Sequence, residues 1–182
     1  MPPADPRSDQ VLIEAANRGD VAAFEALYLR YRDWVVRLAR RFTGNADDAL
    51  DVLQETFAYW LRKFPGFRLT ASVTTFLYPV VKNLSLGLRR KARRLKSPDE
   101  GFLETVPAPP EKTSGSRAEL AAVLAALPEA QRETLLMRFV DGLSLQEIAD
   151  ALNLPLGTVK SRIHNALQTL RGDPRTRAYF RE

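Results

Sequence analysis

The sequence predicts an all-α protein, in which two small helical domains are joined by a flexible linker. Apolar residues recur at helical spacing in both halves of the 182-residue chain, and no segment shows the alternation of a strand. Between the halves, residues 97–116 consist mainly of Pro, Gly, Ser, Thr and acidic residues. Such a segment buries too little apolar area to offset the entropy lost on ordering it. We therefore expect domains at 8–96 and 117–172.

The first domain should contain four helices, at about 8–16, 20–43, 45–64 and 72–96. Ser8, Asp20 and Asn45 each stand where a side-chain oxygen would accept a hydrogen bond from the first turn. Pro65-Gly66 should end the third helix, since neither residue continues a helix readily. Pro79 lies inside the fourth helix and should kink it or delay its regular start.

The second domain should also contain four helices, at about 117–126, 128–141, 144–153 and 156–171. Pro128 suits the first position of its helix, where a missing N–H costs nothing. Ser144 and Glu147 have the spacing of a capping box at the start of the third helix. Leu154-Pro155 breaks the chain before the last helix, which Gly172 should close.

Residues 144–170 have the spacing of a helix-turn-helix. Ala149 is small where two helices approach closely, Asn153 stands at the turn where a left-handed backbone is usual, and Val159 falls on the buried face. A small core is completed by Leu145, Ile148, Leu152, Ile163 and Leu170. The exposed face offers side chains suited to base edges and phosphates: Thr158, Lys160, Ser161, Arg162, His164 and Asn165. The alternative is a plain helical hairpin with a solvated polar face.

Charge indicates a polyanionic partner for the first domain. The net charge is +5 and the sequence pI about 9.7, and residues 1–96 carry 17 basic against 10 acidic side chains. Six of the eight residues at 89–96 are basic. Cations at the C-terminal end of a helix interact favourably with its dipole, but that effect alone does not call for so many, and a surface that binds phosphates does. Upstream, aromatic residues from Phe57 to Tyr78 alternate with cations, a combination that suits unpaired bases. Helical spacing places most of these rings in the core, so one or two should touch a base.

Composition also excludes several classes of protein. The chain has no cysteine, which excludes disulfides, thiolate zinc sites and cysteine nucleophiles. No apolar run approaches the roughly 18 residues of a membrane span, and residues 1–10 do not resemble a signal peptide. We expect a cytoplasmic protein with no membrane insertion. A metal-dependent nuclease built on Asp47, Asp48, Asp51 and Glu55 is the enzymatic alternative, but these acids have no convergent second set and no histidine partner.

Several segments resemble a known family. They are GDVAAFEALYLRYR at 19–32, GNADDALDVLQETF at 44–57, TFLYPVVKN at 75–83 and GTVKSR at 157–162, with Leu127-Pro128 and Glu147-Ile148-Ala149 between. In this order, split by a variable linker, they resemble the extracytoplasmic-function (ECF) RNA polymerase sigma factors. Phe76 stands where the family usually has Trp, Leu50 where it usually has an acidic residue, and Asn165 where a basic residue is common.

The resemblance implies a non-enzymatic protein that brings RNA polymerase to promoters and helps to open them. Residues 8–96 would be sigma region 2, which binds core polymerase and the minus-ten element, and 117–172 would be sigma region 4, which binds the minus thirty-five element. The partners would be the polymerase core, promoter DNA and, in many members, an anti-sigma factor. No catalytic residue, cofactor or metal is implied. The runner-up is a dimeric helix-turn-helix regulator that binds palindromic DNA without the polymerase.

The resemblance also implies roles for particular residues. The polymerase clamp helices would be bound by Asp48, Asp51, Gln54 and Glu55. The melted minus-ten element would be bound by Phe64, Arg68, Phe76, Lys82, Asn83, Arg89 and Arg90. The polar face of the last helix would enter the major groove of the upstream element. For Asn83, a buried structural amide is an equal alternative.

Overall fold

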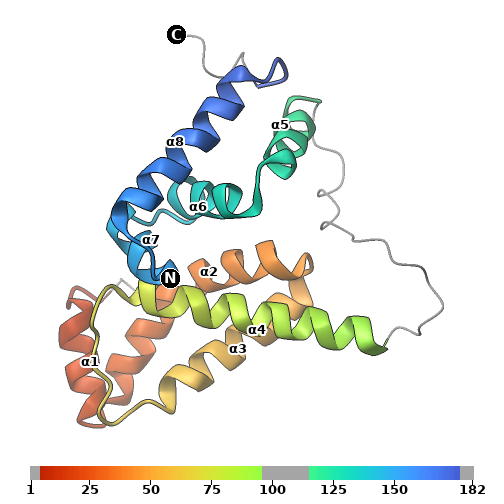
Figure 1. The fold of residues 1–182 in the computed structure, drawn as a ribbon. Coiled ribbons are helices and arrows are strands. Elements are labelled where there is room, and N and C mark those ends of the chain that lie inside the picture. Colours follow the sequence, from red (N-terminus) through yellow and green to blue (C-terminus); the bar gives the residue numbers. More distant parts are fainter. Residues whose placement is uncertain (1–4, 96–114, 177–182) are drawn as a thin grey trace. The chain divides into compact units, whose positions relative to one another are not determined.

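The computed structural model describes residues 5–95 and 115–176, and the chain divides into two compact units, 1–104 and 105–182. Within the described ranges the chain forms eight helices and no strand, which confirms the predicted all-α class (Figure 1). The helices are α1 (Asp9–Asn17), α2 (Val21–Thr43), α3 (Ala46–Leu61), α4 (Val73–Leu95), α5 (Gly115–Ala126), α6 (Glu129–Phe139), α7 (Leu145–Leu152) and α8 (Leu156–Gly172). The predicted linker lies outside the described residues except for 115 and 116, which begin α5.

The predicted N-caps of the first unit are confirmed. The side chain of Ser8 accepts from the Val11 N–H, that of Asp20 from Ala23 and that of Asn45 from Asp48. Each bond satisfies a donor that the first turn of a helix otherwise leaves without a partner. These caps set the points where α1, α2 and α3 begin.

The core of the first unit forms where α2 packs against α1, α3 and α4, and α3 against α4 (Figure 1). Leu27 on α2, Trp60 on α3 and Leu77 on α4 are fully buried. Trp60 is the hub of an aromatic cluster, with the rings of Phe24, Phe57, Phe64, Phe67 and Phe76 centred 5.8–6.5 Å from its own. Burying each large apolar side chain stabilises the unit by roughly 1.5–3 kcal/mol.

The third helix is shorter than predicted, because it ends at Leu61 rather than near Phe64. A tight turn follows, in which the N–H of Lys63 bonds to the Trp60 carbonyl and that of Phe64 to the Leu61 carbonyl. Pro65 disfavours helical dihedrals at Phe64, so the chain does not continue as a helix beyond this turn. After the loop, the Ser72 hydroxyl accepts from the Thr75 N–H at 3.2 Å. From Val73, α4 runs without interruption past Pro79.

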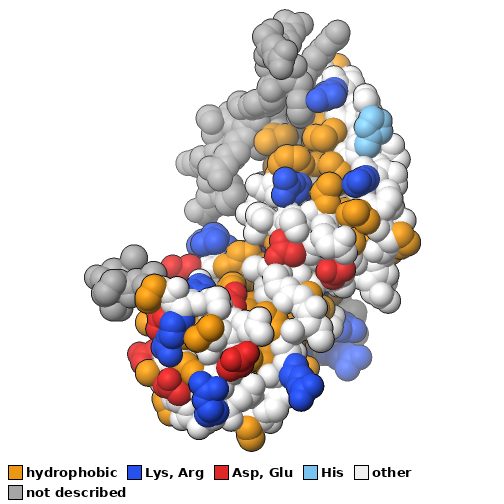
Figure 2. All heavy atoms as spheres, turned by 90° about the vertical axis from the view of Figure 1, so that its left-hand side faces the viewer, with side chains coloured by type: hydrophobic (Ala, Val, Ile, Leu, Met, Phe, Trp, Pro, Cys, Tyr) orange, Lys and Arg blue, Asp and Glu red, His pale blue; other side chains and the backbone are white. Residues whose placement is uncertain are grey.

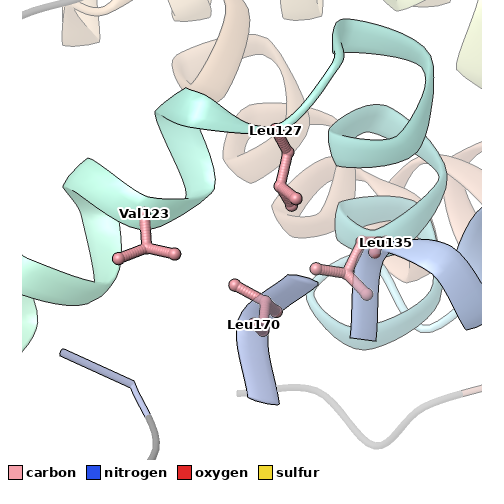
Figure 3. Packing of buried hydrophobic residues seen from close by; sticks show 5 residues of the cluster. Val123, Leu127, Leu135 and Leu170 are labelled. Atoms are coloured by element: carbon pink, nitrogen blue, oxygen red, sulfur yellow. The ribbon is translucent and has the colours of Figure 1, made fainter. Parts of the chain in front are cut away.

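The second unit is held by a cluster between α5, α6 and α8. Val123, Leu127, Leu135 and Leu170 point toward one another, with Ala166 completing the group (Figure 3). At the start of α7, Ser144 and Glu147 form the predicted capping box. Pro128 is the N-cap of α6 rather than its first residue, a shift of one position.

The helix-turn-helix has the predicted turn. Asn153 adopts a left-handed conformation, with φ 52° and ψ 52°, which an Asn side chain tolerates better than most. Ala149 and Val159 are buried on either side of this turn. Leu145 and Leu152, which were predicted to lie in the small core, are only half-buried. The turn fixes the angle at which α8 leaves α7.

Candidate binding surfaces

Asn17, at the end of α1, holds the loop that joins α3 to α4. Its side-chain Nδ2 donates to the Phe67 carbonyl at 2.8 Å, and its Oδ1 accepts from the N–H groups of Gly66 at 2.7 Å and Phe67 at 3.0 Å. Gly66 has a φ of 102°, which favours glycine. Asn17 was not predicted from the sequence, because its partners lie about fifty residues away and form no local motif.

The same loop and α1 enclose a hollow of about 500 Å³, here called the loop hollow. Ile13 and Phe67 give it apolar walls, while Glu14 and Arg68 add charged groups. Of the predicted minus-ten residues, Arg68 lines this hollow and its side chain is exposed. An apolar wall beside charged groups suits a flat, partly polar ring.

Phe64 and Phe76, both predicted to contact DNA, are half-buried members of the Trp60 cluster. Phe67 connects them, since its ring centroid lies 5.5 Å from that of Phe64 and 4.9 Å from that of Phe76. Neither Phe64 nor Phe76 lines the loop hollow, whereas Phe67 does. The two predicted rings therefore support the wall, and Phe67 supplies its aromatic surface.

On α4, Asn83 is exposed, so its interpretation as a buried amide was wrong. Arg90 follows seven residues later and is also exposed, which places both side chains on one side of the helix. Arg89, Arg90 and Arg93 line, with Leu86, a groove of about 330 Å³ that we call the basic groove. Arg93 was not among the predicted site residues, although it belongs to the basic run at 89–96.

Arg89 has a structural bond as well as a position on the basic groove. Its Nη1 donates to the Phe42 carbonyl at 3.3 Å, which ties α4 to the last turn of α2. Lys82 lies seven residues earlier on the same side of α4, and both side chains are half-buried. Lys82 and Arg89 therefore lie beside the exposed side of α4, which carries Asn83 and Arg90.

The predicted polymerase-binding residues lie along α3. Asp51, Gln54 and Glu55 are exposed and fall on one side of the helix at i, i+3 and i+4; we call them the α3 face. Asp48 is half-buried, and its carboxylate accepts from the Asn45 side chain at 2.7 Å. Asp48 thus belongs to the N-terminal cap of α3 as well as to its acidic surface.

On α8, Ser161, His164 and Asn165 are exposed at i, i+3 and i+4, and we call them the α8 face. The histidine, the only one in the chain, lies on the surface of its unit (Figure 2). Gln168, which was not among the predicted residues, continues this face one turn later and is exposed.

The other predicted α8 residues lie around this face. Lys160 is exposed, whereas Thr158 and Arg162 are half-buried at the flank. The hydroxyl of Ser161 donates to the Thr158 carbonyl at 3.0 Å, so this donor must exchange partners to reach DNA. The structure therefore brings all six residues onto one helix but exposes them unequally.

No group of acidic, histidine or cysteine side chains within the described ranges is arranged to hold a metal ion. Among the described helices, none is long and apolar enough to cross a membrane.

Two family models match the chain, one to each unit. Sigma-70 region 2 matches residues 27–95, and sigma-70 region 4 matches residues 117–170. The RNA polymerase sigma-H factor of Pseudomonas aeruginosa is 34% identical over 176 residues, which cover 89% of this chain and 91% of the relative. The ECF RNA polymerase sigma-E factor of Escherichia coli K12 is 31% identical over 180 residues, covering 90% and 92%.

Two solved structures are similar over most of their length. The structure of CnrH in complex with the cytosolic domain of CnrY has a TM-score of 0.65 at 25% identity, covering 88% of this chain and 93% of that one. The sigma factor RpoE, in complex with the anti-sigma factor NepR from Bartonella quintana, has a TM-score of 0.61 at 23% identity, covering 83% and 96%. The second likeness concerns the fold alone.

Proposed function

Because the chain belongs to the ECF group of sigma-70 factors, we propose a role for each of its surfaces in bringing RNA polymerase to a promoter. Sigma factors of this family bind core polymerase and DNA and direct transcription initiation, and they are not catalytic. The chain is a sigma factor in this sense. The assignment of residues and domain limits is our own.

We place sigma region 2 at 8–96, the linker at 97–116 and sigma region 4 at 117–172. The family matches at 27–95 and 117–170 support both domains. Including α1 in region 2 is supported by Asn17, which holds the loop between α3 and α4. Without α1, the loop hollow would lose one of its walls.

The loop hollow receives a base taken out of the minus-ten stack. An extruded base needs an enclosing site with a stacking surface and polar groups for its edge. Phe67 offers the stacking surface, and Arg68 and Glu14 offer charged groups. Holding one base in this way stabilises the melted strand, which is how the protein would help to open the promoter.

The exposed side of α4 tracks the DNA backbone beside that base. Asn83 and Arg90 lie on it, and Arg93 extends it along the basic groove. Each cation that neutralises a phosphate releases condensed counterions, so binding should weaken with salt. Lys82 and Arg89 contribute from the flank, Arg89 while bonded to Phe42.

The α3 face binds core polymerase. Asp51, Gln54 and Glu55 are exposed acceptors on one side of a rigid helix that the Trp60 cluster anchors from behind. The family resemblance points to the clamp helices of the largest catalytic subunit as the partner. Asp48 contributes from the cap.

The α8 face reads the major groove of the minus thirty-five element. A recognition helix presents its polar side to base edges while the preceding helix lies across the backbone. Ser161, Asn165 and Gln168 can pair with bases, and Lys160, Arg162 and His164 can reach phosphates or guanine. The half-buried Thr158 lies in the first turn of α8, where a helix N-terminus favours a phosphate.

An anti-sigma factor is a further partner that we propose for this chain, which would act in the cytoplasm. Support comes from the structure of CnrH, which is a complex with the cytosolic domain of CnrY, and from the anti-sigma factors found in complexes of structural neighbours.

The observation that carries the function is the presence, in one chain, of both sigma-70 region matches over units with exposed polar surfaces. Run-off transcription with core polymerase and promoters selected from a random library tests it. Initiation from a two-element site is expected. Replacing Ser161 and Asn165 together by Ala should weaken use of the upstream element about tenfold or more, since a good base contact is worth about 1–3 kcal/mol. The control is Glu129→Ala, at an exposed position of α6 outside both helices of the motif.

The proposal fails if core polymerase does not initiate transcription with the protein and the protein alone protects a palindromic site. The protein would then be a dimeric regulator.

A further inference from the structure

Residues 5–9, which we call the N-terminal strap, are bound to α2 by one arginine. The Nη2 of Arg30 donates to the backbone carbonyls of Asp5 and Arg7, at 2.8 Å each, and its Nη1 donates to the Asp9 carboxylate. A guanidinium carries five N–H groups in a fixed plane, so it can hold several acceptors at once in one geometry. Arg30 therefore fixes the path of the strap along α2. The strap lies before residue 27, where the match to sigma-70 region 2 begins.

Asp9, the last residue of the strap, is also the first residue of α1. One of its carboxylate oxygens accepts from Arg30 and the other accepts from the Tyr31 hydroxyl. The side chains of Arg30 and Asp9 are only 29% and 25% exposed, so salt and water screen their attraction less than at an open surface. Hydrogen bonds at both oxygens of a charged group fix its position closely. The start of α1 is therefore tied to two adjacent residues of α2.

The first helix needs such a tie to keep a fixed position on its neighbour. It has nine residues, and a helix of this length is marginal on its own. Its buried side chains, Leu12, Ile13 and Ala15, pack in the core that α1 shares with α2. Apolar burial is not directional, whereas hydrogen bonds are, so the packing alone specifies the rotation and shift of α1 less sharply.

The side of α1 that faces the loop hollow begins directly after Asp9. Gln10, Glu14 and Asn17 line the hollow and follow one another at i, i+4 and i+7. The side-chain Nε2 of Gln10 donates to Glu14 Oε1 at 3.3 Å, which joins the first two. Asn17 is held by the loop, whereas Gln10 and Glu14 lie toward the end that the strap holds. A shift of the first turn of α1 would therefore move two of the three polar residues on this wall.

We propose that Arg30 is a positioning residue for the extruded base and that it acts through the N-terminal strap. Arg30 does not line the loop hollow itself. By holding the strap, it keeps Gln10 and Glu14 opposite Phe67, which forms the aromatic wall. A site that is already in place when its ligand arrives loses less conformational freedom on binding, so the base is held more tightly. This inference rests on the proposed role of the loop hollow as the site of the extruded base.

The test uses polymerase holoenzyme assembled from core polymerase and the full-length chain. Its binding to a dye-labelled single strand that carries the minus-ten sequence is measured by fluorescence anisotropy. Further strands carry an abasic site at each minus-ten position in turn. For the unmodified chain, the abasic site at the extruded position should raise Kd about tenfold, the usual scale of losing one stacked base. Arg30→Ala should raise Kd for the intact strand about fivefold, because the site is no longer in place in advance, and should leave Kd for that abasic strand unchanged.

Two further variants accompany Arg30→Ala. Arg30→Lys keeps a cation for Asp9 but lacks the planar fork that also holds two carbonyls, so its effect should be intermediate. Arg37→Ala is the matched control, because Arg37 is an exposed arginine seven residues later on the same side of α2 and does not line the loop hollow. It should bind every strand like the unmodified chain. Circular dichroism melting checks each fold, and Arg30→Lys carries the comparison if Arg30→Ala does not fold.

The intact and abasic strands separate the possible failures. If Arg30→Ala weakens binding of both strands equally, Arg30 has only a general structural role and the proposal is refuted. If Arg30→Ala binds both strands like the unmodified chain, the proposal is also refuted, while the loop hollow keeps its proposed function. If no abasic site changes the Kd of the unmodified chain, the loop hollow holds no base, and the proposed function of that site fails independently of Arg30.

Discussion

The two units build the surfaces that we propose for DNA binding in different ways. In the first unit, the loop hollow combines α1 with a loop about fifty residues away, joined by the three hydrogen bonds of Asn17. In the second unit, the α8 face comes from a single helix, positioned by the turn at Asn153. A surface assembled from distant segments depends on tertiary packing, whereas a surface on one helix depends mainly on how that helix is docked.

The largest expected effect comes from breaking the core of one unit. Trp60→Ala should cost about 3–5 kcal/mol, because it removes a fully buried ring from the centre of the aromatic cluster. Leu127→Ala is the counterpart in the second unit and should cost about 2–5 kcal/mol. Hydrogen exchange followed by mass spectrometry should show that each variant loses protection only in its own unit. Loss of protection in both units would contradict their separation.

The second effect concerns the loop. Asn17→Ala removes three hydrogen bonds and should lower the free energy of unfolding by about 1–3 kcal/mol. Transcription should fall by more than this loss of stability alone would cause. Asn17→Asp keeps the acceptor for Gly66 and Phe67 but loses the donor, so it should be intermediate. Thermal melts and run-off transcription of the three proteins give the comparison. Full activity of Asn17→Ala would show that the loop needs no anchor.

These two units also differ in how far the sequence could predict them. The α8 face follows from a local motif, because Ala149, Asn153 and Val159 stand at fixed offsets within one hairpin. All six predicted residues indeed lie on α8, and periodicity alone could have added Gln168. Boundaries and caps were similarly local, apart from the early end of α3 before Pro65.

The loop hollow was harder to predict, because its parts meet only in three dimensions. Arg68 was named, but Asn17 carries no local signal and Phe67 could not be distinguished from the neighbouring rings. Exposure also depends on packing, which is why Asn83 was left between two interpretations and Arg89 was not expected to bond to Phe42. A surface on a single helix can thus be predicted from residue spacing, whereas a surface assembled from distant segments can be predicted only when the fold is known.

A smaller effect tests the turn that docks α8. Asn153→Ala should destabilise the second unit by about 1 kcal/mol, since Ala lacks the short polar side chain that lets Asn tolerate a left-handed backbone. Asn153→Gly should be neutral or slightly stabilising, because glycine adopts this conformation without strain. Chemical denaturation, followed by hydrogen exchange in residues 120–176, measures the stability of the second unit in both variants. Equal stability of the Ala and Gly variants would show that the turn is not under conformational constraint.

The smallest effect is one that both units share. Asp5 accepts from Arg7 and Asp173 accepts from Arg175, and these hydrogen bonds lower the pKa of both carboxyls, that of Asp5 to about 2. A lowered folded-state pKa gives stability that is present above the ordinary value near 3.8 and is lost as pH falls toward the folded value. Asp5→Asn and Asp173→Asn should each make the melting temperature slightly less sensitive to pH between about 4 and 2. An unchanged pH dependence would show that the ion pairs are too exposed to matter.

The most direct measurement of the difference between the units is run-off transcription on two templates, one fully duplex and one with the minus-ten region already unpaired. Asn17→Ala should lose much of its defect on the unpaired template, because the work of opening is then already done. The Ser161→Ala/Asn165→Ala double variant should keep the same defect on both, because its element is duplex in each. Equal responses of the two variants to the unpaired template would contradict the division between a unit that holds melted DNA and a unit that reads duplex DNA.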